Sequence, residues 1–121
     1  MTGIIVVDDE PFVARNLQKT FQRAGYSPVD TEGNPKVAIE GIVSGSYGIV
    51  FSDTEMPGMK GYEMMDAVRA KGCTVPFVGT SARADLYRDA WLTRGAEFVE
   101  KGSSMKPYLE VASKVLGSQV G

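Results

Sequence analysis

The sequence of 121 residues contains no histidine. This absence excludes a Ser-His-Asp or Cys-His nucleophile, a histidine-ligated zinc ion and a phosphohistidine intermediate within the chain. Acid, base and ligand chemistry must therefore fall to carboxylates, lysine, tyrosine, serine, threonine and the one cysteine.

Cysteine is almost as scarce, because Cys73 is the only one. No internal disulfide can form, and no second cysteine is available to resolve an oxidised thiol. We therefore expect Cys73 to be a small residue in the loop after a helix rather than a redox sensor. This cysteine usage is typical of intracellular proteins, and we expect a cytoplasmic location.

Long apolar runs and a strong net charge are missing too. No stretch reaches the roughly 18 apolar residues of a membrane span, and no basic region precedes the first apolar run, so neither a span nor a signal peptide is expected. The 13 Lys and Arg against 15 Asp and Glu give a net charge of −2, which argues against a generic nucleic-acid or membrane-surface binder. The length is typical of one domain, and we expect residues 1–121 to form it.

Five short apolar runs alternate with longer amphipathic segments. The runs at residues 4–7 and 47–52 are apolar without alternation, which is typical of parallel strands buried on both faces. A weaker strand is expected at residues 26–31, and two further strands are expected at residues 75–80 and 96–100. Helices are expected from Pro11, from Pro35, after Gly61, from Ala84, and after a cap at Ser103 or Ser104.

This alternation predicts an α/β fold of the flavodoxin-like, doubly wound (βα)5 kind, a three-layer sandwich around a five-stranded parallel sheet. Pro28 cannot donate to a strand ladder, so the second strand should lie at an edge. The strand order 2-1-3-4-5 satisfies this requirement and opens a crevice at the carboxyl ends of strands one and three.

Reactive side chains follow the predicted strands at that crevice. Asp8 and Asp9 follow the first strand, Asp53 the third, Ser81 the fourth and Lys101 the fifth. Three carboxylates at one crevice would raise each other's pKa, and a bound Mg²⁺ would offset that repulsion. A carboxylate beside Mg²⁺ and a lysine can act as a nucleophile towards phosphorus, with the hydroxyl and the ammonium group contacting phosphoryl oxygens.

Four stretches resemble the receiver domain of two-component response regulators, of the kind found alone in the chemotaxis regulator. They are IIVVDDEP at 4–11, VFSDTEMPGMKG at 50–61, VPFVGTSA at 75–82 and GAEFVEK at 95–101. They occur in the family's order, at near-family spacing, and span nearly the whole chain. The resemblance implies a stand-alone receiver over residues 1–121 without an output domain, which signals by altered partner binding or by phosphotransfer.

The resemblance also implies a role for each matching residue. Asp53 would be the phospho-acceptor. Asp8 and Asp9 would hold Mg²⁺ together with Asp53, and the backbone carbonyl of Glu55 would be a further ligand. The phosphodonor would be a separate histidine kinase or histidine phosphotransfer protein, and the chain would act on itself, with autodephosphorylation, rather than as an enzyme in the usual sense.

The remaining matches concern the response to phosphorylation. Ser81 would be the switch hydroxyl, and Ala82 the small residue that leaves room for the phosphoryl group. Phe98 matches the family's aromatic switch, although a plain core role fits it equally well. Lys101 would contact the phosphate, and the downstream target would be another protein, with neither nucleic acid nor membrane as a partner.

The sequence departs from the family pattern at several positions. Gly102 stands where the family usually has a cis proline, and a non-proline cis bond costs about 2.5–4 kcal/mol, so we expect a trans bond and a re-routed loop. The segment from Ser81 to Lys101 is shorter than usual. Gly79 stands where bulkier aliphatic residues are common, and it should weaken the strand or admit another backbone. Trp91 is expected to be partly buried on its helix or exposed for partner docking.

Glu55 and Arg83 lie two positions after Asp53 and Ser81, respectively. Both side chains should border the crevice, where an ion pair between them would hinder the approach of water to an acyl phosphate. An exposed pair contributes little energy, so the expected effect is steric gating.

Three other functions share features with this sequence. An FMN protein of the same fold needs a phosphate loop after the first strand, where acidic residues would repel phosphate. A Mg²⁺-dependent phosphohydrolase typically carries an Asp-x-Asp pair and a cap insertion, whereas residues 53–55 read Asp-Thr-Glu without an insertion. A pseudo-receiver that binds partners without phosphorylation is the alternative that stays open.

Overall fold

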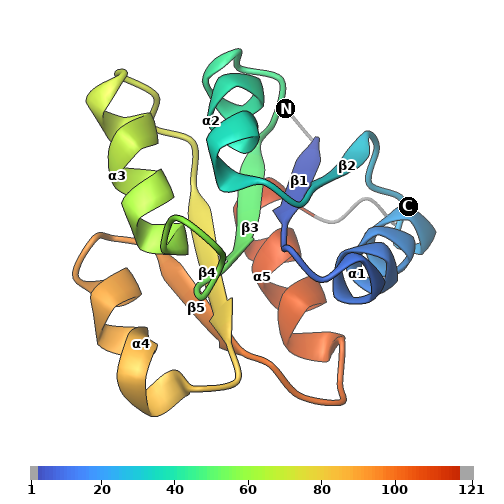
Figure 1. The fold of residues 1–121 in the computed structure, drawn as a ribbon. Helices are drawn as coiled ribbons and strands as arrows, with labels where there is room; N and C mark the ends of the chain where they lie inside the picture. The colour runs from blue at the N-terminus through green and yellow to red at the C-terminus, as the bar shows by residue number, and fades with distance from the viewer. Residues whose placement is uncertain (1–2, 118–121) are drawn as a thin grey trace.

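The computed structural model describes residues 3–117, which form one parallel sheet with five helices (Figure 1). The strands are β1 (Ile4–Val7), β2 (Val29–Glu32), β3 (Ile49–Asp53), β4 (Phe77–Ser81) and β5 (Glu97–Glu100). The helices are α1 (Pro11–Arg23), α2 (Pro35–Val43), α3 (Gly61–Ala70), α4 (Ala84–Leu92) and α5 (Lys106–Leu116). The strand order is β2-β1-β3-β4-β5, which confirms the predicted doubly wound topology.

Both faces of the sheet are covered, as the non-alternating apolar strands predict. In β1, Ile4 and Val6 face a cluster that includes residues of α1 and α5, while Ile5 and Val7 face a cluster that includes residues of α2, α3 and α4. Figure 1 shows these two helical layers on opposite sides of the sheet. Successive side chains of a strand point to opposite faces, so a strand buried on both faces must be apolar throughout.

The edge position of β2 is confirmed, but its start is not. The strand begins at Val29 rather than near residue 26, so Pro28 precedes it. The Pro28 carbonyl still accepts a hydrogen bond from the Ile4 amide at 2.9 Å, while its nitrogen has no N–H to donate.

The cap expected from Asn34 is present, since its side chain accepts a hydrogen bond from the Lys36 amide at 2.9 Å. The cap expected at Ser103 or Ser104 is wrong: Met105 is the residue before α5, although the Ser104 hydroxyl accepts from the Lys106 amide at 3.1 Å.

The register of the parallel strands aligns their carboxyl ends. Asp53 pairs with Thr80, and the Lys101 amide donates to the Ser81 carbonyl at 2.9 Å. The Lys101–Gly102 bond is trans, because the only cis peptide bond among residues 3–117 precedes Pro28. Within those residues, every helix is too short or too polar to cross a membrane.

Candidate functional site

The ends of β1 and β3 bring three carboxylates together. Val7 pairs with Ser52, so Asp8 and Asp53 leave the sheet side by side, and Asp9 follows in the next position. One oxygen from each carboxylate lies within 4.8 Å of the other two. Asp8 is 3% exposed and Asp53 9% exposed, so two of the three charges are largely withdrawn from water. Such a cluster suits a hard cation with oxygen ligands.

Lys101 lies between the two buried carboxylates. Its Nζ atom is 3.1 Å from Asp53 Oδ1 and 3.2 Å from Asp8 Oδ2. The backbone bond to Ser81 fixes the start of this loop, and the trans bond to Gly102 leaves the lysine in contact with both acids. The expected departure at Gly102 is therefore present, and it does not remove the lysine from the cluster.

The pKa values of these groups reflect an excess of negative charge. Burial and the neighbouring Asp8 raise the pKa of Asp53, against the opposing effects of Lys101 and the Thr54 amide. Burial opposes the charging of Lys101, but Asp53 and Asp8 raise its pKa above the ordinary value. One ammonium group thus faces two buried carboxylates, and the imbalance favours a bound cation.

The raised pKa of Asp53 predicts that its charge destabilises the metal-free fold. Between the ordinary and the raised pKa the native state binds more protons than the unfolded state, so stability falls as pH rises through that interval. At neutral pH without divalent cations, we expect Asp53→Asn to have a higher urea midpoint than wild type. The difference should shrink as the pH falls towards the ordinary carboxyl pKa of about 4.

Asp89→Asn, on the exposed face of α4, is the matched control and should leave the urea midpoint nearly unchanged. A lower midpoint for Asp53→Asn than for wild type would contradict the electrostatic account of the cluster.

The other residues singled out in the sequence border this cluster or lie further along the sheet. Ser81 ends β4, and its hydroxyl accepts a hydrogen bond at 2.9 Å from the amide of Arg83, the residue directly before α4. Arg83 and Glu55 form an ion pair at 3.7 Å with side chains 58% and 44% exposed. Phe98 is half-buried on β5, and the guanidinium carbon of Arg88 lies 5.1 Å from the centre of its ring.

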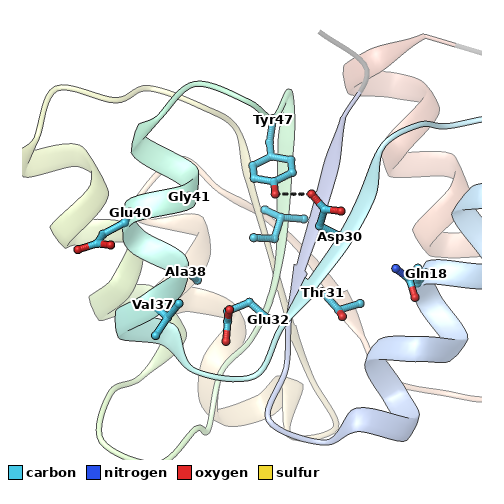
Figure 2. Close-up of a pocket in the computed structure, with 10 residues that line it drawn as sticks. Gln18, Asp30, Thr31, Glu32, Val37, Ala38, Glu40, Gly41 and Tyr47 are labelled. Carbon is cyan, nitrogen blue, oxygen red and sulfur yellow. Dashed lines mark hydrogen bonds between the residues drawn. The ribbon is translucent and has the colours of Figure 1, made fainter.

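A larger groove lies away from this cluster (Figure 2). It measures about 590 Å³ and lies along β2 and α2, with Asp30, Glu32, Glu40 and Tyr47 in its walls. The Tyr47 hydroxyl donates to Asp30, and burial together with that carboxylate raises the pKa of Tyr47 to about 12. Two carboxylates of the cluster, Asp8 and Asp9, instead line a smaller cavity of about 220 Å³. The size of a groove therefore does not locate the carboxylate cluster, whereas the meeting of the strand ends does.

The packing of Trp91 against Gly79 differs from what the sequence predicts. Trp91 is fully buried, so the expectation of a partly buried or exposed tryptophan is wrong. Gly79 admits the indole ring of Trp91 rather than another backbone. A glycine in an apolar strand, followed by a lone tryptophan on the next helix, was the available signal.

Comparison with known proteins finds a matching family model and related sequences. The family model for the response regulator receiver domain matches residues 4–111. The sensor histidine kinase RcsC of Salmonella typhimurium is 36% identical over 81 residues, which is 67% of this chain and 8% of the relative. The response regulator ArlR of Staphylococcus saprophyticus is 31% identical over 98 residues, 80% of this chain and 44% of the relative. This chain thus spans less than half the length of these curated relatives.

Solved structures resemble the chain over almost its full length. The response regulator TrrA of Thermotoga maritima, solved in complex with Mg²⁺-BeF, has 33% identity and a TM-score of 0.85, and the match covers 95% of this chain and 99% of that one. The chemotaxis protein CheY4 of Vibrio cholerae has 24% identity and a TM-score of 0.82, with 95% and 98% covered, which supports the fold alone.

Proposed function

The chain belongs to the response regulator receiver domain family of two-component signalling, and we propose that it accepts a phosphoryl group on Asp53 in a Mg²⁺-dependent reaction. The observation that carries this proposal is the contact of one lysine, Lys101, with both Asp53 and Asp8 inside the carboxylate cluster. The phosphorylated chain would signal by altered binding to a partner protein or by passing the group onward.

Receiver domains bind Mg²⁺ at an acidic pocket, and the residues present fit that ion. We assign the metal to the carboxylates of Asp8, Asp9 and Asp53 and to the backbone carbonyl of Glu55. The three carboxylates supply the close oxygen ligands that a hard cation prefers, and their excess negative charge favours its binding. When bound, the ion neutralises charge on phosphoryl oxygens.

The chemistry at the chain's own atoms is a displacement at phosphorus. A carboxylate oxygen of Asp53 forms the new O–P bond, the P–N bond of a phosphohistidine breaks, and its electron pair stays on the imidazole nitrogen. The Lys101 ammonium group pairs with a phosphoryl oxygen, and the Ser81 hydroxyl donates to another. The 121 residues contain no histidine, and we infer that the donor is the phosphohistidine of a histidine kinase or a histidine phosphotransfer protein.

The response would pass through Ser81 and Phe98. Once Ser81 turns its hydroxyl towards the phosphoryl group, it releases the Arg83 amide at the start of α4. Ala82 leaves space for the added group, and Phe98, half-buried on β5, would change its position in response. We place this cycle in the cytoplasm, with residues 1–121 acting as one receiver and a downstream protein reading its surface.

Phosphoryl uptake from a small donor tests the proposal. We expect Mg²⁺ and phosphoramidate to add one phosphoryl group to the intact protein, measured by mass spectrometry, and a chelator to prevent it. Asp53→Ala should take up none. No uptake by the wild-type chain with any donor or metal would contradict the proposal and favour the pseudo-receiver.

The Glu55–Arg83 ion pair predicts a longer life for the acyl phosphate. We expect Arg83→Ala to speed autodephosphorylation by up to about fivefold, because an exposed pair is worth at most about 1 kcal/mol and acts here by hindering water. The decay of the phosphorylated species by mass spectrometry after removal of the donor measures this rate. Arg23→Ala, at an exposed position of α1, is a control, and an unchanged rate in Arg83→Ala would exclude gating.

A further inference from the structure

Two buried groups meet at the side chain of Thr54, the residue directly after the phospho-acceptor. The Trp91 indole Nε1–H donates to the Thr54 hydroxyl at 2.9 Å, and that hydroxyl donates to the Thr80 carbonyl at 2.9 Å. The Thr54 amide donates to Asp53 Oδ1, also at 2.9 Å. We call the contacts among Thr54, Thr80 and Trp91 the Thr54 junction.

The Thr54 junction is fully paired and inaccessible to water. Thr54 and Trp91 are both 0% exposed, and Thr80 is 2% exposed. An indole N–H can only donate, so Thr54 must present its lone pair there and its proton to Thr80. The hydroxyl therefore has one orientation, and it joins the end of β3, the end of β4 and helix α4.

Two glycines build the seat of the indole ring. A Cβ atom at Gly79 would lie 2.2 Å from ring carbons of Trp91, and one at Gly61 would lie 2.9 Å from Trp91 Cζ2. The Tyr62 ring packs edge-on against the indole, with centroids 6.1 Å apart, and the Phe77 ring stacks on it at 6.5 Å. This seat holds α4 in one position relative to the strand ends.

We propose that Trp91 is a positioning residue for the phosphorylation site, acting through Thr54 on Asp53 and on the Thr80–Ser81 segment. This inference rests on the proposed function for its effect on reaction rate. Thr54 carries the amide that orients the Asp53 carboxylate, and Thr80 precedes the switch hydroxyl of Ser81. Since coupling between two sites is reciprocal, a change at Asp53 also alters the surroundings of the Trp91 indole and hence of α4.

The substitution Thr54→Val tests the junction, because it keeps the shape of the side chain and removes the hydroxyl. We expect the rate of Mg²⁺-dependent phosphoryl uptake from phosphoramidate, per folded molecule, to fall by about tenfold, as for other groups that orient a reactive residue. Thr54→Ser should retain most of the rate. The matched control is Thr20→Val, which removes an exposed hydroxyl bonded within α1 and should change nothing.

A second readout does not depend on phosphorylation. Trp91 is the one tryptophan of the chain, so its indole N–H gives a single NMR signal. We expect Asp53→Asn to shift that signal and Glu110→Gln, at an exposed position of α5 on the other face of the sheet, to leave it in place. If wild type takes up phosphate while Thr54→Val reacts at an equal rate, the positioning role is wrong and the proposed function stands. If no chain takes up phosphate, the proposed function fails, and an unshifted indole signal in Asp53→Asn overturns the coupling as well.

Discussion

Gly79→Ala should lower the free energy of unfolding by about 3 kcal/mol or more, although it adds a single methyl group. Alanine would normally be favoured over glycine in a strand by roughly 0.5–1 kcal/mol. Here the added Cβ would lie 2.2 Å from Cδ2 and Cε2 of Trp91, well inside contact distance. The indole cannot retreat, because Thr54 holds its N–H and Phe77 stacks on its ring. Urea denaturation measures the loss.

The companion substitution Trp91→Leu makes this prediction specific. Alone it should destabilise the protein by about 3 kcal/mol through lost packing and an unfilled space. In the double variant the methyl group of Ala at position 79 occupies part of that space, so Gly79→Ala should add little further loss, which a double-mutant cycle detects as coupling. Gly41→Ala is the control, because its Cβ would meet only Tyr47, at 4.0 Å. Full stability of Gly79→Ala alone would mean that the indole is not seated as described.

Lys101→Met should slow phosphoryl uptake at saturating donor and Mg²⁺ by about 100-fold. The lysine Nζ lies 3.1 Å from Asp53 Oδ1, where negative charge is shared with the incoming phosphoryl oxygens during transfer. Methionine has a similar length and no charge, so the loss isolates the ammonium group. Because the charge of Lys101 also offsets two buried carboxylates, the rate is referred to the folded fraction, measured with Mg²⁺ present.

The control for that substitution lies on the surface of α5. Lys114 pairs with Glu97 at 3.1 Å, with its side chain 66% exposed. Lys114→Met should react at the wild-type rate, since an exposed pair far from the strand ends contributes little. A rate for Lys101→Met within about twofold of wild type would show that the lysine does not contribute to phosphoryl transfer.

The sheet and its carboxylate cluster could be predicted because they depend on local signals and one topological rule. Continuous apolar runs at 4–7 and 47–52 predict buried parallel strands, and Pro28 assigns an edge. With the strand order set, the residues that follow each strand must meet at one edge of the sheet. Asp8, Asp53 and Lys101 therefore came together as predicted, and the Glu55–Arg83 contact formed as well.

The Thr54 junction could not be predicted, because it depends on how one helix packs against two strands. Whether Trp91 points inward is decided by space at Gly79 and by a partner for its N–H, and both belong to other segments of the chain. Thr54 itself reads as an ordinary residue between an acid and a loop. A buried polar side chain needs hydrogen-bond partners, and for Thr54 these partners are known only from the three-dimensional structure.

The position of the phosphoryl group tests the account most directly. Borohydride reduces an aspartyl-phosphate to homoserine, so reduction after incubation with Mg²⁺ and phosphoramidate, followed by peptide mapping, marks the acceptor residue. The proposal predicts homoserine at position 53 alone, because Asp53, at the end of β3, is the proposed acceptor beside Lys101, whereas Asp8 and Asp9 are assigned to the metal. Homoserine at position 8 or 9, or none at any position, would contradict the account.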